Sequence, residues 1–422
     1  MTPSDPWLVV RALIVASGLW VASPAAAQTQ ADLFDDTRLH DVYLTLSQRD
    51  WDALRAHPEV DTYYPADLRW SGVIVRNAGI RSRGNSTRNG VKPGLRVDIN
   101  RYIDQTFLGL RAVVLDNAYT DPTLMREVLS MKLFARLGLP ASREAFARLF
   151  VNNEYAGVYV MVEPVDRTFV ERAFGTAEGN VEDGGYLYEY TWEREYGFEY
   201  LGSSLTAYAE LFAPRTHETD APVRLYQPIE ALARAVNETT PDRLERDVGP
   251  LVDLAALARF LAVQRAVGEI DGFLGNWGMS NFYLYRFRDG RPAQLLPWDA
   301  DHAFWDPNQA IDDRLDTNVL IRTIMAVPAQ RQAYLQALVD AATAMATVVP
   351  GDSRAWLERE ADRLASLIRP AVATDPAAAF TPEEFDANLQ DLLAFLRTRP
   401  SYVLCAAGAA LDASAPQSCP LP

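Results

Sequence analysis

The chain has 422 residues, of which 49% are hydrophobic and 23% are charged, and its formal net charge is −16. This length allows one large domain or two smaller ones, and the composition is that of a globular protein. The negative charge excludes nucleic acid held by bulk electrostatic attraction, so an anionic ligand would need a local basic cluster or a bound cation.

The first 27 residues have the pattern of a targeting segment. An apolar run, WLVVRALIVASGLWVA, is followed by Ala25 and Ala27 at the small-residue positions before a cut after residue 27. This pattern predicts a cleavable signal peptide, and an uncleaved membrane anchor is the alternative reading. We therefore expect a mature protein that is secreted, periplasmic or held in the cell envelope, with no membrane span once the signal is removed.

Short strands dominate residues 37–166, which predicts a β-rich N-terminal lobe. Ser47 is placed to cap a short helix, and residues 68–102 read as successive strands with polar turns. Residues 120–140 have apolar side chains at helical spacing and end in glycine and proline, which predicts an amphipathic helix. Residues 146–166 read as a hairpin with its turn at Asn152, Asn153 and Glu154.

The second half of the chain has a different pattern. Residues 175–250 are polar, aromatic and irregular, which predicts an insertion between two lobes. Residues 253–270 form a helix that is apolar on nearly all sides and is therefore buried. A hairpin over 281–298 follows, and residues 317–400 are helical. The order predicts an α+β fold with a mostly helical C-terminal lobe, residues 251–400, and a ligand cleft between the lobes.

An Ala/Pro-rich tail, residues 401–422, contains both cysteines of the chain. In an oxidising compartment Cys405 and Cys419 would close a small loop. With four scattered histidines, they give no zinc-finger spacing. The sequence also contains no Gly-x-Ser-x-Gly elbow and no Walker A loop.

The second hairpin places polar residues at its open end. If Asp289 and Gly290 are the central turn residues, Trp298 stands opposite Asn281. The Asp299 carboxylate and the Asn281 amide then emerge at the same end of the hairpin. We expect this end to carry chemistry, because an apolar strand leads directly into it.

The loop before this hairpin brings further oxygen ligands. Asp271 and Asn276 precede Asn281, while Asp301 follows Asp299, and residues 266–285 include no lysine and no arginine. Carboxylate and amide oxygens suit Mg²⁺, Mn²⁺ or Ca²⁺. Each residue alone is typical of a turn; together they predict a metal site.

The spacing of these residues matches phosphoryl-transfer sites. In protein kinases a catalytic-loop aspartate is followed five residues later by a metal-binding asparagine, and a metal-binding aspartate follows the next strands. Asp271, Asn276 and Asp299 occur in this order. Asp271 is the candidate that orients the acceptor hydroxyl, and the other two, with Asn281 and Asp301, are candidates for holding cations.

Basic residues gather in RSRGNSTRNGVKPGLRVDI, residues 81–99. Arg83, Lys92 and Arg96 lie around a polar turn and could bind phosphates, although a solvated hairpin is the alternative. Glu163, at the end of a strand, is either a hinge residue near a nucleotide base or a plain strand-end charge. Glu127 and Lys132, on the predicted helix, could face the cleft, but a solvated surface pair is the default reading.

Several motifs in order resemble the CotH kinase family, the spore-coat-type atypical protein kinases. The similar stretches lie between residues 40 and 310 and include IRSRGNSTR, KPGLRVDI, VNNEYAGVYVMVEPVD, NFYLYRF and LPWDADHAF. The resemblance implies an atypical protein-kinase-like bilobal fold over residues 28–400. It also implies ATP with Mg²⁺ or Mn²⁺ as cofactors, and transfer of the γ-phosphoryl group to Ser or Thr of secreted or surface proteins.

The same resemblance implies roles for individual residues. Asp299 corresponds to the metal-binding aspartate of the Pro-Trp-Asp-x-Asp motif, and Asn281 to the amide in the strand before it. Asp271 or Asn276 occupies the catalytic-loop position. Basic residues on the phosphate side correspond to Lys92 and Arg83.

The chain departs from the family pattern in places. Pro93 stands where members often have a second lysine, Asp98 where a further basic residue is common, and Trp305 where a glycine is usual. Members often place an aspartate nearer the second hairpin, where this chain has Asn276. An inactive kinase-like scaffold of the cell envelope is therefore the alternative function.

A third reading is a Ca²⁺-stabilised module that binds carbohydrate or another polymer. It is suggested by four tryptophans, Trp192, Trp277, Trp298 and Trp305. Indoles lining an open groove would support this reading, and buried indoles would count against it.

Overall fold

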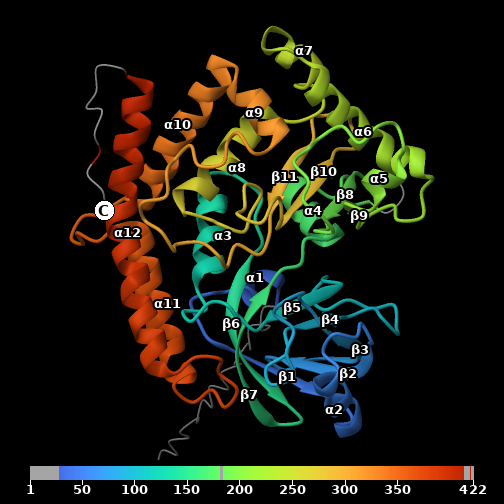
Figure 1. Cartoon of the computed structure of the whole chain (residues 1–422). Helices are drawn as coiled ribbons and strands as arrows, with labels where there is room; N and C mark the ends of the chain where they lie inside the picture. The colour runs from blue at the N-terminus through green and yellow to red at the C-terminus, as the bar shows by residue number, and fades with distance from the viewer. Residues whose placement is uncertain (1–27, 181–183, 413–418, 420–422) are drawn as a thin grey trace, which may run out of the picture.

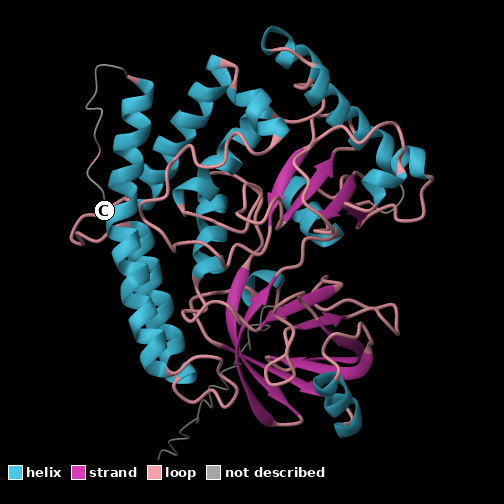
Figure 2. Cartoon of the chain, in the orientation of Figure 1, coloured by secondary structure: helices cyan, strands magenta, loops and turns pink. Residues whose placement is uncertain are grey.

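The computed structural model describes residues 28–180, 184–412 and 419. The predicted signal peptide and most of the tail lie outside the described residues. Helices and strands are both abundant, in keeping with the predicted α+β class (Figure 2). No helix in the described part is long and apolar enough to cross a membrane.

The N-terminal part is a closed seven-stranded barrel in the order β1-β2-β3-β4-β5-β7-β6. The pairing of β1 with β6 is parallel, and the other neighbours are antiparallel. Alternating apolar side chains fill the interior, and closure leaves no open sheet edge. The strands are β1 (His40–Thr45), β2 (Tyr64–Trp70), β3 (Val73–Ser82), β4 (Leu95–Asp98), β5 (Ala112–Asp116), β6 (Glu144–Val151) and β7 (Glu154–Val162).

Two short helices accompany the barrel, α1 (Gln30–Leu33) and α2 (Gln48–Ala56). The predicted cap of α2 is confirmed, because the Ser47 side chain accepts the Asp50 backbone N–H at 3.1 Å. The predicted turn between β6 and β7 is also confirmed, since Asn152 and Asn153 both adopt positive φ angles between these strands.

A second sheet has four strands in the order β11-β10-β8-β9. They are β8 (Tyr186–Tyr190), β9 (Phe212–Pro214), β10 (Phe282–Arg286) and β11 (Gln294–Pro297). The prediction that residues 175–250 are irregular is wrong, because this segment supplies β8 and β9 together with α5 (Thr206–Ala209), α6 (Pro222–Glu238), the 3₁₀ helix Pro241–Arg243 and α7 (Leu244–Asp247). Strand β8 forms by pairing with β10, a partner distant in sequence that local patterns do not reveal.

The remaining helices lie beside the second sheet and, in the case of α11 (Trp356–Val372), beside the barrel (Figure 1). They are α3 (Arg126–Arg136), α4 (Arg167–Phe174), α8 (Leu254–Ala266), α9 (Val319–Met325), α10 (Pro328–Met345), α11 and α12 (Pro382–Leu411). The apolar helix α8 is buried, as predicted, in the core that it shares with α10 and α12. The C-terminal part is therefore a helical layer with a small sheet at one side.

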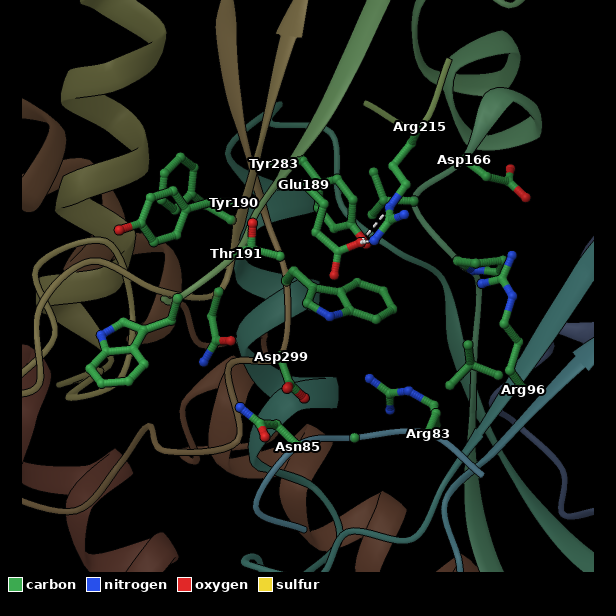
Figure 3. Close-up of a pocket in the computed structure, with 18 of the residues that line it drawn as sticks. Arg83, Asn85, Arg96, Asp166, Glu189, Tyr190, Thr191, Arg215, Tyr283 and Asp299 are labelled. Atoms are coloured by element: carbon green, nitrogen blue, oxygen red, sulfur yellow. Dashed lines mark hydrogen bonds and ion pairs between the residues drawn. The ribbon is translucent and has the colours of Figure 1, made fainter. Parts of the chain in front are cut away.

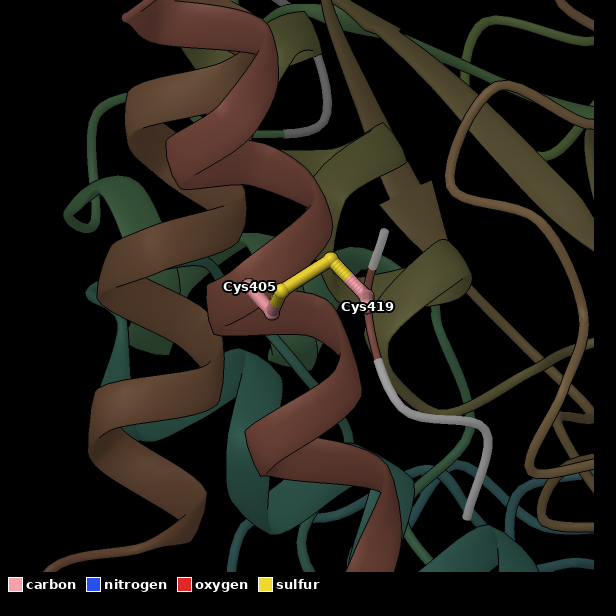
Figure 4. The surroundings of a disulfide bond; sticks show 2 residues. All are labelled: Cys405 and Cys419. Atoms are coloured by element: carbon pink, nitrogen blue, oxygen red, sulfur yellow. A yellow bond between two sulfur atoms is a disulfide. The ribbon is translucent and has the colours of Figure 1, made fainter. Parts of the chain in front are cut away.

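The last helix extends further than the sequence suggested. Thr381 caps α12 through a reciprocal capping box with Glu384, as its spacing predicts. The helix continues to Leu411 and so includes the first half of the predicted tail. Cys405 on this helix forms a disulfide with Cys419 (Figure 4).

The hairpin of α11 and α12 reaches from the helical part down to the barrel (Figure 1). In the loop between these helices, Asp375 accepts the Lys92 ammonium at 2.8 Å and the Val158 backbone N–H at 2.9 Å. The side chains of Lys92 and Asp375 are 7% and 3% exposed. A Cβ at Gly157 would lie 2.5 Å from the Asp375 carboxylate, so glycine is required there. A buried ion pair thus joins the two parts of the chain.

Candidate functional site

A cleft of about 750 Å³ lies between the barrel and the four-stranded sheet. The hairpin of β10 and β11 forms one wall, and the β3–β4 region forms the other (Figure 3). Its lining is polar and includes Arg83, Asn85, Arg88, Arg96, Asp166, Glu189, Trp192, Arg215, Ser280, Asn281, Tyr283, Trp298 and Asp299. The cleft is therefore large enough for a nucleotide-sized ligand and lined by many charges.

The open end of the β10–β11 hairpin has the predicted register. Phe282 pairs with Pro297, and the Trp298 backbone N–H donates to the Asn281 carbonyl at 3.2 Å. Asn281 and Asp299 both adopt left-handed backbone angles, with φ of 56° and 52°. Non-glycine residues in this region carry strain that often marks a functional position.

A side chain on helix α3 accepts a hydrogen bond from the backbone of Asp299. The Asp299 N–H donates to Glu127 Oε1 at 3.0 Å, and Glu127 is only 8% exposed. The prediction that Glu127 and Lys132 form a solvated surface pair is wrong, because Lys132 instead contacts Asp36 and Glu360. Helix α3 therefore places a buried carboxylate directly against the hairpin end.

Carboxyl groups crowd this end of the cleft. Burial raises the pKa of Asp299 to about 6, although Arg83 opposes the shift. Burial also raises the pKa of Glu127, with Glu144 and Asp299 adding to the effect. Asp301 accepts the Thr120 hydroxyl, and its pKa is raised by burial and then by Asp299. These carboxyl groups would ionise more readily beside an added cation.

Asp271 lies directly behind the residues that line the cleft. Its Oδ1 accepts the Ser280 hydroxyl at 2.7 Å, and its Oδ2 accepts the Asn281 amide at 3.2 Å. The same amide donates to the Asp271 carbonyl at 2.7 Å. Ser280 and Asn281 line the cleft themselves, whereas Asp271 is half-buried beneath them. The structure thus brings together Asp271, Asn281 and Asp299.

Asn276 is placed differently from these three residues. It is exposed, does not line the cleft, and its backbone N–H donates to the Ile270 carbonyl at 2.7 Å. This hydrogen bond closes the loop that carries Asp271. Asn276 stays a predicted metal ligand that this conformation does not bring to the hairpin end.

The predicted basic residues divide into two groups. Arg83 and Arg96 line the cleft (Figure 3). Arg83 pairs with Asp116 and lies 5.5 Å from the centre of the Trp298 ring. Within the described residues, Arg96 has no hydrogen-bond or ion-pair partner. Lys92, in contrast, is buried against Asp375 outside the cleft.

Glu163 is fully buried at the end of β7 and forms ion pairs with Arg143 and Arg172, both at 2.7 Å. It does not line the cleft, whereas Pro164 and Val165, the next residues, do. In this arrangement, Glu163 anchors the segment that connects the barrel to α4.

The donor set is compatible with a nucleotide and Mg²⁺ or Mn²⁺. Among the described residues, no three histidine, cysteine, aspartate or glutamate side chains are close enough to hold a metal ion alone. Mg²⁺ commonly uses one or two carboxylates, with water and substrate phosphates completing its shell. Asp299 and Asn281 can supply such a partial set, while Arg83 and Arg96 face the same space.

Of the three exposed tryptophans, Trp192 and Trp277 contact each other, and Trp305 lies against Arg126. Trp192 lines the cleft, and its indole N–H donates to the Trp277 carbonyl at 3.0 Å. Trp192, Trp277 and Trp305 are 50%, 57% and 44% exposed, while Trp298 is half-buried in the cleft wall. The interpretation of these tryptophans as a carbohydrate- or polymer-binding surface stays a prediction.

The buried carboxyl groups predict a pH dependence of stability for the metal-free protein. Burial raises the pKa of Glu269 from 4.5 to about 8 and that of Asp299 from 3.8 to about 6. The folded state therefore keeps protons that the unfolded chain releases. The contribution of these two groups to the free energy of unfolding is complete below about pH 4 and is lost as the pH rises through 6 and 8. We expect the melting temperature to fall between pH 5 and pH 9.

Calorimetry across this range, in the presence of a chelator, checks the expectation. The Glu269→Gln variant should show a shallower fall between pH 6 and pH 8, because its side chain cannot ionise. A melting temperature that rises throughout the window would contradict the assignment of these shifts.

Comparisons with known proteins find a family model and a similar protein. A family model described as CotH kinase protein matches residues 80–403. The chain is also similar to the inner spore coat protein H of Bacillus subtilis (strain 168), with 24% identity over 336 residues, which cover 77% of this chain and 85% of that protein.

Proposed function

Because the chain belongs to the CotH kinase family, we propose that it is an ATP- and divalent-metal-dependent phosphotransferase with a kinase-like bilobal fold. In this proposal, the barrel (about residues 37–166) is the N-terminal lobe and residues 251–400 are the core of the C-terminal lobe, with 175–250 between them in a domain spanning 28–400. The acceptors are Ser or Thr residues of proteins in the cell envelope or outside the cell.

One observation carries the proposal: a strained aspartate and an unpaired guanidinium face the same cleft. Asp299 has a φ of 52° and lies at the hairpin end beside Asn281. Arg96 lines the same cleft and forms no hydrogen bond or ion pair among the described residues, and its charge acts on Asp166 in the same lining. An oxygen ligand for a cation and a free cationic side chain are together what a metal-bound polyphosphate requires.

The residues divide the work of phosphoryl transfer as follows. Arg83 and Arg96 bind and orient phosphate oxygens, and Asp299 with Asn281 provides the oxygen ligands for the cation, with Asp301 behind them. A bound Mg²⁺ or Mn²⁺ ion would neutralise phosphate charge. Asp271, which lies behind Ser280 and Asn281, accepts the proton of the acceptor hydroxyl. In-line positioning supplies most of the acceleration.

The location of the protein belongs to the same proposal. A cleavable signal over residues 1–27 would deliver the chain to the periplasm, the cell envelope or the medium. The similarity to a spore coat protein supports an envelope or extracellular site of action.

A transfer assay tests the function. Residues 28–422 are incubated with γ-labelled ATP and Mn²⁺ or Mg²⁺, beside the Asp271→Asn variant. We expect label on the wild-type protein or on an added Ser/Thr-containing protein, and a loss of about 10²- to 10⁴-fold in the variant, the range typical of a general base. ATP-dependent thermal stabilisation should persist in Asp271→Asn, since Asp271 does not line the cleft.

A second candidate function is a kinase-like protein that binds the nucleotide without transferring phosphate. It is favoured by the placement of Asn276 outside the cleft and of Lys92 against Asp375. ATP-dependent stabilisation of a wild-type protein that shows no transfer would support this candidate. If ATP gives no stabilisation and the protein transfers no phosphate, both candidate functions are contradicted.

A further inference from the structure

The loop that carries Asp271 rests on a buried glutamate. Glu269 follows α8 and is 1% exposed. Its Oε1 accepts the Asp271 backbone N–H at 2.7 Å. The contact reaches the candidate base through its backbone N–H, whereas Ser280 and Asn281 donate to its carboxylate.

The rest of the loop is fixed around this contact. Arg265 is fully buried and donates through one guanidinium nitrogen to the carbonyls of Glu269 and Leu274, both at 3.1 Å. A Cβ at Gly272 would lie 2.9 Å from Glu269 Cγ, so the loop sits directly on this side chain. Arg265 therefore connects the backbone at Glu269 and Leu274, on either side of Asp271, and the Glu269 side chain supports Asp271 itself.

We propose that Glu269 is a positioning residue, whose side-chain oxygen fixes Asp271 in the orientation that transfer requires. The inference rests on the proposed function for its kinetic consequence. Removal of the acceptor leaves the Asp271 N–H without a partner and frees the backbone to rotate, while the ATP-binding side chains stay in place. A displacement of about 1 Å at a reacting group costs on the order of 10²-fold in rate.

The chemistry of the contact predicts which substitution is tolerated. The hydrogen bond needs an acceptor oxygen and not a negative charge. Burial raises the pKa of Glu269 to about 8, so the carboxyl is largely protonated at neutral pH and resembles an amide. Its Oε2 is buried and has no hydrogen-bond partner among the described residues. Glutamine keeps both the oxygen and the size of the side chain, whereas methionine keeps only the size.

The test compares Glu269→Gln and Glu269→Met with the wild-type protein, as residues 28–422. For Glu269→Met we expect kcat to fall about 10²-fold with the KM for ATP unchanged, and amide exchange of residues 268–281 to accelerate. For Glu269→Gln we expect kcat within about threefold of wild type and unchanged exchange. Exchange is measured by mass spectrometry without nucleotide, so it does not depend on activity.

Glu178→Met is the matched control. Glu178 is 5% exposed and does not line the cleft. Its carboxylate accepts the Arg288 backbone N–H at 3.1 Å and the Tyr285 hydroxyl at 3.0 Å and pairs with Arg291. This variant also loses a buried acceptor for a backbone N–H, and we expect it to lower the melting temperature while kcat stays at the wild-type value. A purely structural role for Glu269 would make the two methionine variants alike.

The outcomes separate the positioning role from the proposed function. Unchanged kcat in Glu269→Met, or a Glu269→Gln variant as slow as Glu269→Met, overturns the inference. If the wild-type protein transfers no phosphate, the proposed function fails, and the exchange data still decide: unchanged exchange in Glu269→Met overturns the support role. If Glu269→Met does not fold, Glu269→Asp, which withdraws the carboxyl by one methylene, is judged by the same two readouts.

Discussion

Replacement of Asp299 by asparagine is expected to reduce phosphoryl transfer by about 10³-fold or more, because it removes the anionic ligand at the centre of the proposed metal site. The side chain keeps its size, and the backbone N–H that donates to Glu127 remains. Mn²⁺-dependent stabilisation by ATP should disappear as well. The measurements are transfer of label from γ-labelled ATP and the melting temperature with each ligand combination.

Asp289→Asn is the control for this prediction. Asp289 lies at the opposite end of the same hairpin, where its carboxylate contacts the exposed Arg291 at 2.8 Å. We expect this variant to transfer phosphate at the wild-type rate. Undiminished ATP binding and transfer in Asp299→Asn would remove the basis for a metal site at this aspartate.

Replacement of Asp375 by alanine is expected to destabilise the protein by about 3–5 kcal/mol, because it leaves the buried Lys92 ammonium unpaired. Asp375 is 3% exposed on its side chain and also accepts the Val158 backbone N–H. Burial lowers the pKa of Lys92, against the effect of Asp375, so in the variant Lys92 would lose its proton more readily. Urea denaturation at pH 7 measures the change in unfolding free energy.

Two further variants give this prediction its reference points. Asp386→Ala removes a partner of Arg369 on the same pair of helices, but both side chains are about half exposed, so a loss of about 0–1 kcal/mol is expected. The double variant Lys92→Met/Asp375→Leu removes both charges and should regain much of the lost stability. Equal effects of Asp375→Ala and Asp386→Ala would show that the buried pair contributes little.

Local sequence patterns predicted those elements that are defined by residues close together in the chain, such as hairpin turns and helix caps. The register of the β10–β11 hairpin followed from the Asp289-Gly290 turn, and the caps at Ser47 and Thr381 followed from side chains within one turn of the helix. The barrel closure did not follow, because β1 pairs with β6 across about a hundred residues. Strand β8 was missed for the same reason.

The candidate site was predictable to the same extent. The polar residues of the hairpin end, Asn281 and Asp299, lie together because one turn fixes both. Glu127 was read by default as solvated and Glu269 was not singled out, because a glutamate on or next to a helix has the same appearance in sequence whether it is solvated or buried. Lys92 was assigned to phosphates because its partner, Asp375, is 283 residues away.

The closed barrel has a consequence for how this protein is divided into fragments. The family match begins at residue 80, inside β3 (Val73–Ser82), and so leaves out β1, β2 and most of β3. A fragment cut at that boundary would lose β1, β2 and most of β3, and would expose the unpaired edges of β4 and β6 to other chains. Such a fragment should aggregate, even though it contains every residue of the cleft from Arg81 onward, and a soluble preparation requires the sequence before the match.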